Sequence, residues 1–179
     1  MKATLVLGAM ALAFAACTPT AASAPNDRES ATIVDAAVAT PELSTLTTAV
    51  KAAGLARTLS SDGPFTVFAP VNGAFAKLPG STVETLLMPR NRAALANVLT
   101  YHVIPRRLSS RALLSLVRAH RGRARLHTVQ GEALTVSRGF GGALVLTDAK
   151  GGRSLITAAD LDQSNGVVHL IDSVVLPKA

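Results

Sequence analysis

The chain has 179 residues, with 18 Lys and Arg against 11 Asp and Glu, which gives a formal net charge of +7 at pH 7. Its single cysteine excludes internal disulfide bonds. Five Phe, one Tyr and no Trp offer few rings on which bases could stack, so nucleic acid is not an expected partner.

Residues 1–17 predict an export signal. Lys2 is followed by an apolar run from Leu5 to Ala16, which is too short to span a bilayer and suits the core of a signal peptide. Cys17 ends that run in a segment that resembles a bacterial lipoprotein cleavage box, although Phe14 stands where Leu is usual. We therefore expect Cys17 to be lipidated. Ordinary signal-peptidase cleavage nearby is the alternative.

These features predict the location and the domain division. The protein is expected to be exported, either as a periplasmic or cell-surface lipoprotein held to the membrane only by its lipid anchor, or as a secreted protein. Residues 18–29 are rich in Pro, Ser, Thr and Ala and predict a flexible tether. Residues 30–179 are apolar and regular, a suitable length for one domain around one core.

Helical spacing dominates the first part of this domain. The predicted helices are Thr32–Val38, a segment around Leu43–Val50 that ends at Gly54, Leu55–Leu59, Asn72–Leu78, 81–88, Asn91–Thr100 and one capped by Ser109 or Ser110. Two strands, Phe65–Ala69 and one near Tyr101–Ile104, interrupt them.

After Gly122 the apolar residues alternate, which predicts strands. These are Ala124–Val129, Ala133–Ser137, Ala143–Thr147, Ser154–Ala158 and Val167–Leu176, separated by turn-like segments. Helices followed by a β-meander indicate an α+β fold rather than a doubly wound parallel sheet.

Three segments in this order resemble the signature boxes of the fasciclin domain family: residues 63–75 (GPFTVFAPVNGAF), 99–105 (LTYHVIP) and 165–177 (NGVVHLIDSVVLP). The resemblance implies a wedge of two β-sheets with flanking helices. It also implies extracellular adhesion or matrix contact and no shared catalytic centre. Val71 and Gly73 depart from the family pattern, so the helix after Pro70 is expected to be capped by Asn72 or by water.

The resemblance also suggests where partners bind. Animal members contact integrins around the Tyr-His box, which implies that the neighbourhood of Tyr101 and His102 faces partners here. The sequence itself favours a structural role for His102, which is expected to form a fixed hydrogen bond at the edge of the sheet.

No catalytic or metal-binding motif is present in the sequence, and no cofactor is expected. His169 and Asp172 invite comparison with a catalytic dyad. Residues three apart on a regular strand point to opposite faces, so each is expected to satisfy buried backbone groups instead. The protein is therefore predicted not to be an enzyme.

One stretch is strongly basic. No Asp or Glu occurs between Glu84 and Glu132, a region that holds Arg90, Arg92, Arg106, Arg107, Arg111, Arg118, Arg121, Arg123 and Arg125. The predicted partner-binding residues are Tyr101, His102 and the arginines from Arg106 to Arg125. Guanidinium groups fit carboxylates and phosphates, so the expected partner is an acidic polysaccharide, anionic lipid or acidic protein surface.

Two alternatives stay open from the sequence. The arginines could serve only to keep the surface soluble. The protein could instead carry a small apolar molecule between its helices and its sheet.

Overall fold

The computed structural model describes residues 31–78 and 80–178. The predicted export signal, Cys17 and the tether at residues 18–29 lie outside these ranges.

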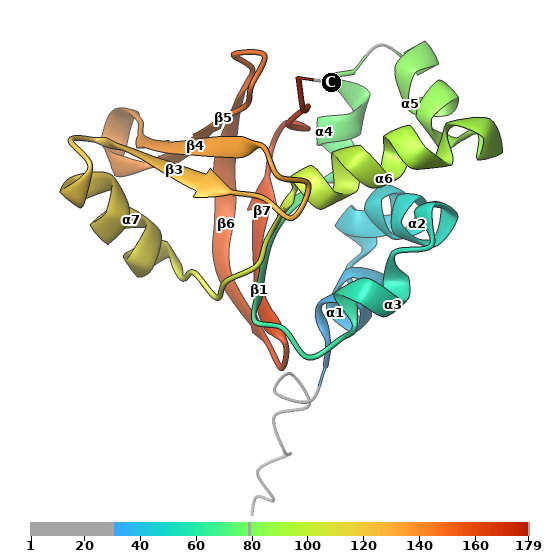
Figure 1. The fold of residues 1–179 in the computed structure, drawn as a ribbon, viewed down its shortest axis with the longest axis horizontal. Helices are drawn as coiled ribbons and strands as arrows, with labels where there is room; N and C mark the ends of the chain where they lie inside the picture. Colours follow the sequence, from blue (N-terminus) through green and yellow to red (C-terminus); the bar gives the residue numbers. More distant parts are fainter. Residues whose placement is uncertain (1–30, 79, 179) are drawn as a thin grey trace, which may run out of the picture.

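The helices fall mainly in the first half of the chain (Figure 1). They are α1 (Ile33–Ala39), α2 (Ser44–Ala53), α3 (Ala56–Leu59), α4 (Asn72–Ala76), α5 (Gly80–Leu87), α6 (Arg92–Tyr101) and α7 (Ser110–Ala119), with 3-10 turns η1 (Pro41–Leu43), η2 (Pro89–Asn91) and η3 (Phe140–Gly142). Within the described ranges, no helix is long and apolar enough to cross a membrane.

Local capping signals explain several helix ends. Thr32 caps α1 in a capping box with Asp35, Ser109 caps α7, and Gly54 closes α2 in the left-handed conformation. The expected role of Asn72 is wrong, because α4 begins at Asn72 itself. Its carboxamide serves the start of α2 instead, accepting from the Thr45 N–H at 3.1 Å.

The strands form one hydrogen-bonded order, β2-β1-β7-β6-β5-β4-β3. They are β1 (Phe65–Pro70), β2 (Val103–Ile104), β3 (Arg123–His127), β4 (Ala133–Arg138), β5 (Leu144–Thr147), β6 (Arg153–Gln163) and β7 (Gly166–Ile171). Strands β3 to β7 pair antiparallel in sequence order, which confirms the predicted meander. The sequence did not predict that β7 pairs parallel with β1.

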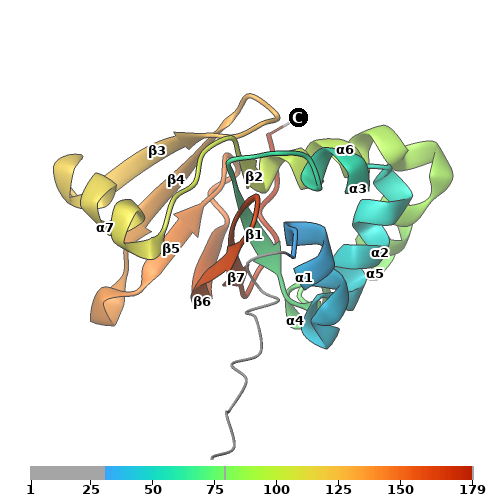
Figure 2. The same cartoon turned by 90° about the horizontal axis from the view of Figure 1, so that it is seen from below.

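Strand β6 divides this order into two sheets, as the wedge requires. Its first residues, Arg153–Leu155, pair with β5, whereas the segment from Ile156 onward pairs with β7. The register shifts twice along the second segment, and such irregularities bend a strand. The two sheets therefore share β6, and the fold is the predicted α+β wedge (Figures 1 and 2).

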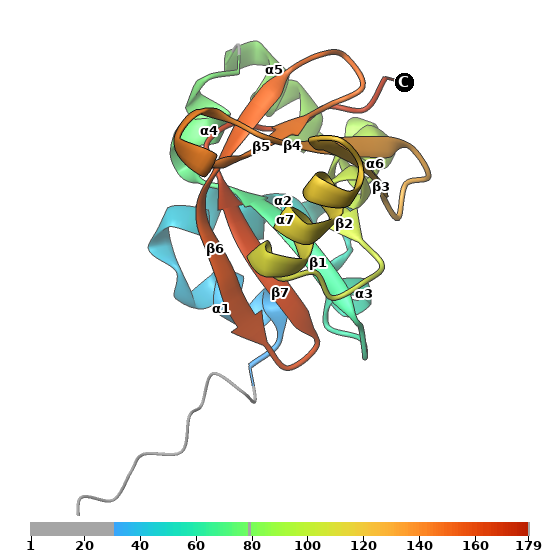
Figure 3. The same cartoon turned by 90° about the vertical axis from the view of Figure 1, so that its left-hand side faces the viewer.

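Two hydrophobic cores lie on either side of β1 and β7. Val67, Ala69, Val168 and Leu170 face helices α1, α2 and α6, while Phe68 and Ile171 face the meander. Burial on both faces explains why β1 and β7 are largely apolar, with Thr66 and His169 as their polar side chains. Helix α7 closes the second core against β3 and β4, with Leu113 and Val117 buried (Figure 3).

Candidate functional site

Tyr101 lies in the interior, at the last residue of α6. The predicted strand near Tyr101–Ile104 is shorter than expected, because α6 continues through Tyr101 and β2 begins only at Val103. The Tyr101 side chain is 0% exposed. Its hydroxyl donates to the Ala133 C=O at 3.2 Å and accepts from the Ala149 N–H at 3.1 Å, so it ties α6 to the start of β4 and to the β5–β6 turn. Burial raises the pKa of the Tyr101 hydroxyl.

His102 is also buried, at 2% exposure. Its Nε2 accepts from the Val175 N–H at 3.3 Å, so Nδ1 carries the proton and donates to the Val98 C=O at 2.7 Å. The predicted fixed hydrogen bond is confirmed, at a helix end rather than a sheet edge. Burial lowers the pKa of His102 to about 4, which keeps the ring neutral at pH 7.

These positions correct one expectation. A side chain enclosed on all sides offers no atoms to a partner, so Tyr101 and His102 do not form a contact surface in this structure. Whether the surface around them binds a partner stays a prediction.

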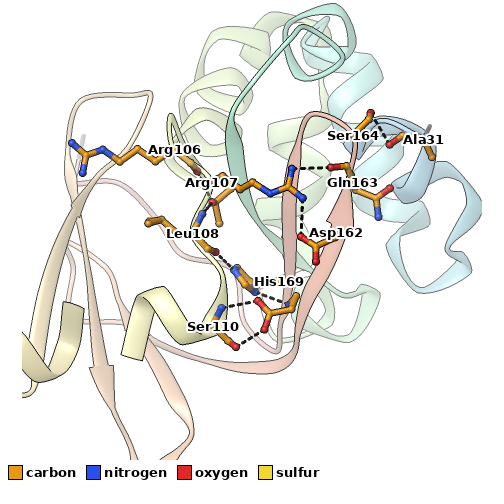
Figure 4. A network of polar contacts seen from close by, with 11 residues as sticks. Ala31, Arg106, Arg107, Leu108, Ser110, Asp162, Gln163, Ser164 and His169 are labelled. Carbon is orange, nitrogen blue, oxygen red and sulfur yellow. Dashed lines mark hydrogen bonds and ion pairs between the residues drawn. The ribbon is translucent and has the colours of Figure 1, made fainter. Parts of the chain in front are cut away.

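His169 forms a second buried bridge, on the meander side of β7 (Figure 4). Its Nδ1 accepts from the Asp160 N–H at 3.2 Å and its Nε2 donates to the Leu108 C=O at 2.8 Å, while the ring stacks on Phe68 with centroids 5.6 Å apart. Burial lowers the pKa of His169. The ring therefore has no free nitrogen for proton transfer.

The carboxylate of Asp172 likewise binds other groups of the fold. Its carboxylate accepts from the Leu155 N–H at 2.8 Å and from the Lys77 ammonium at 3.0 Å, and no hydrogen bond links it to His169 among the described residues. The prediction that these two residues satisfy backbone groups is confirmed. No buried side-chain nitrogen or oxygen in the described part of the chain lacks a hydrogen-bond partner. Across the same residues, no three His, Cys, Asp or Glu side chains gather where a metal could bind.

Two apolar cavities lie between the helices and the sheet, where the carrier alternative places its ligand. Leu46, Val50, Val67 and Leu99 are among the residues lining the first, of about 30 Å³, and the second has about 20 Å³. Each holds about one water-sized sphere, whereas ligand pockets measure several hundred Å³. Neither cavity holds a small apolar molecule in this conformation.

The arginines of the acid-free stretch, which include the predicted partner-binding set from Arg106 to Arg125, are exposed but dispersed. Arg90 and Arg92 lie on the helical side of the molecule, and Arg92 donates to the Ala53 C=O at 3.1 Å. Arg106 and Arg107 lie between β2 and α7, where Arg107 pairs with Asp162 at 2.9 Å and donates to the Gln163 C=O (Figure 4). Arg111 and Arg118 lie on α7, Arg121 in the turn that follows, and Arg123 and Arg125 on β3. Within the described residues, Arg107 alone of this set pairs with a carboxylate.

The outer face of the meander brings two of these arginines together with two others. Arg123 and Arg125 of β3 share this face with Arg153 of β6, because their neighbours Ala124, Leu126 and Ser154 point inward. Arg138, at the end of β4, also borders a depression of about 360 Å³ there. Sequence reasoning missed Arg138 and Arg153, since they lie outside the acid-free stretch. The strand register is the signal that connects them to β3.

The geometry by itself defines a class of protein. It is a two-core α+β wedge whose buried polar side chains all serve the fold and whose exposed arginines are the main chemical feature of the surface. Residues 41–177 match the Fasciclin domain family. The chain therefore belongs to the fasciclin domain family.

Individual relatives agree with this assignment. The protein sll1483 of Synechocystis is 44% identical over 146 residues, which cover 82% of this chain and 73% of the relative. The immunogenic protein MPB70 of Mycobacterium bovis is 34% identical over 171 residues, covering 93% and 79%. A solved structure of a FAS1 domain pair from the insect cell adhesion molecule fasciclin I superposes with a TM-score of 0.73 at 19% identity, over 81% of this chain and 50% of that one. The last comparison supports the fold alone.

Proposed function

We propose that this protein is a non-enzymatic adhesion module that is exported to the bacterial envelope and attaches to an anionic component through exposed arginines. Family membership supports the general class, an adhesion domain of the fasciclin type. The absence of an enzymatic role is inferred from His102, His169 and Asp172, whose polar atoms are occupied by the fold.

One observation supports the proposal that the partner is anionic. Six of the seven predicted arginines, all except Arg107, form no ion pair within the described residues, so their charges are available to a partner. An exposed guanidinium loses little solvation when it binds a carboxylate or sulfate, and it can form two parallel hydrogen bonds.

The location remains part of the proposal. Lipidation of Cys17 would hold the domain at the membrane and leave residues 18–29 as a tether. Mass spectrometry of the protein extracted from membranes would then find acyl chains on Cys17. A free Cys17 thiol, or a mature chain that begins after Cys17, would contradict the anchor.

The binding proposal is tested with the purified protein on immobilised polygalacturonate, a carboxylated polysaccharide, and on neutral dextran as the control. We expect retention on polygalacturonate alone, with a decrease as NaCl rises from about 50 mM to about 500 mM, because salt screens exposed charges. Equal retention on both polymers, or retention that is indifferent to salt, would contradict an anionic partner.

A further inference from the structure

One row of residues on the outer face of the meander combines charge and hydrogen-bonding groups. In register across four strands it reads Arg125 on β3, Thr135 on β4, Thr147 on β5 and Arg153 on β6. Arg123 and Ser137 pair in the next outward-facing row. The threonines and Ser137 are half-buried and the arginines are exposed. Cationic groups therefore stand at both ends of a row of hydroxyl groups.

We propose that this face is a binding site for an acidic polysaccharide, a chain of sugars that carries a carboxylate or sulfate on its repeating unit. The inference rests on the proposed function and narrows it from exposed arginines in general to Arg123, Arg125, Arg138 and Arg153. The charge, the spacing and the shape of the face each support this assignment.

The charge of this face is uncompensated. The outward-facing residues of β3, β4, β5 and the first three residues of β6 include no Asp or Glu in the described structure. The nearby carboxylate of Asp148 is turned inward, where it accepts from the N–H groups of Gly152 and Leu176. No ion pair or hydrogen bond involves the four arginine side chains among the described residues. Their attraction for an anion is therefore not weakened by a protein carboxylate.

The spacing favours a polymer over a small anion. Arg125 and Arg153 are separated by three inter-strand spacings, about 14 Å between their backbone positions. Arg123 lies two residues from Arg125, about 7 Å along β3. A chain with repeated charges reaches several of these positions at once, whereas a single carboxylate or sulfate is shorter than the row.

Shape and hydrogen bonding favour sugar over a lipid surface. Arg123, Arg138 and Arg153 border a depression of about 360 Å³, and the bottom of a hollow does not touch a flat bilayer. The hydroxyls of Thr135 and Thr147 inside it are both donors and acceptors, as sugar hydroxyls require, and the Ser137 hydroxyl, which donates to the Val145 C=O at 3.4 Å, can still accept. A bilayer would instead engage Phe140, which is fully exposed at the tip of the β4–β5 hairpin and does not line the depression.

The test compares two double variants that each remove two positive charges. The first, Arg125→Ser with Arg153→Ser, removes the positive charge from both ends of the row. Arg57→Ser with Arg90→Ser is the matched control, on α3 and η2 across the molecule from the meander. All four side chains are exposed and none belongs to either core, so both variants keep the fold. Binding is measured to polygalacturonate and to dextran sulfate at low salt.

We expect the Arg125/Arg153 variant to bind roughly tenfold more weakly or worse, because each lost contact is a charge-assisted hydrogen bond. The control should stay within about twofold of the unmodified protein, since distant charges are screened. Equal losses in both variants would overturn the proposed site while leaving a diffuse anionic attraction, the broader proposal, intact. No binding of the unmodified protein to either polymer would defeat both.

A third variant, Phe140→Ser, decides between polysaccharide and membrane. It should leave binding to both polymers unchanged. Stronger binding to phosphatidylglycerol vesicles than to the polymers, lost in Phe140→Ser, would overturn the polysaccharide and assign the face to anionic lipid.

Discussion

Single buried polar side chains hold distant segments of this fold together. Tyr101 joins α6 to Ala133 and Ala149, His102 joins Val98 to Val175, and His169 joins Leu108 to Asp160. Each side chain forms hydrogen bonds with two backbone groups, which water would solvate in the unfolded chain. Such residues would look functional in a sequence, since a Tyr-His pair suggests a binding motif and a histidine near an aspartate suggests catalysis. Their burial assigns them to stability.

The two buried histidines predict a pH dependence of stability. Burial lowers the folded-state pKa of His102 to about 4 and that of His169 below its ordinary value, whereas the unfolded chain binds these protons near pH 6.5. The stabilisation is therefore complete above about pH 6.5 and is lost as the pH falls toward 4. For His102 alone, the free energy of unfolding should drop by roughly 2 kcal/mol between about pH 7 and pH 5.

Urea unfolding at both pH values measures this drop. His102→Gln should reduce it, because the substituted side chain does not titrate in this range. His127→Gln, at an exposed position on β3, is the control and should leave the drop unchanged. An unfolding free energy that is level from pH 7 to pH 5 in the unmodified protein would contradict the assignment of two neutral, buried histidines.

At the scale of elements, the parallel pairing of β1 with β7 unites the two halves of the chain. Asn165, in the β6–β7 turn, reinforces it by accepting from the Ile33 N–H at 3.0 Å and donating to the Leu59 C=O at 2.7 Å. Gly166 follows and stands opposite Phe65. A Cβ at Gly166 would lie 2.1 Å from the Phe65 carbonyl oxygen, so the close approach of the strands requires glycine there.

Gly166→Ala should therefore destabilise the protein by roughly 2 kcal/mol or more, because backbone must move to admit the methyl group. Gly73→Ala is the matched control, because a Cβ added at Gly73 would meet no atom within 4 Å and the residue sits in helix α4. That change should be neutral or stabilise by up to about 1 kcal/mol. Chemical denaturation of both variants gives the comparison, and equal effects would show that strand spacing is not the constraint.

For the whole molecule, local sequence signals predicted the helices and strands, whereas contacts between residues far apart in sequence determine how these elements pair and pack. Ser109 and Gly54 marked helix ends that the structure confirms, and alternation marked the meander strands. The β1–β7 pairing and the burial of Tyr101 depend on contacts between residues far apart in sequence, which periodicity does not report. The proposed arginine site could not be predicted from the sequence for the same reason, because strand register rather than sequence distance places Arg153 in one row with Arg125.

The two cores also determine which surface remains free. Helices cover one side of β1 and β7, and the meander covers the other with its apolar face (Figure 2). The outer face of β3, β4, β5 and the first three residues of β6 is left to solvent, and in the described structure it carries arginines without carboxylates. The proposed adhesion through this face would leave the fold undisturbed, because none of its arginines contributes to either core.

The most direct measurement follows backbone amide chemical shifts by NMR while polygalacturonate oligosaccharides are added to the protein at low salt. The largest changes should fall on β3, on Thr135 and Ser137, on Thr147 and on Arg153, and they should fade as salt is added. Changes centred on helices α1 to α6, or none at any concentration, would contradict a polysaccharide site on the outer face of the meander.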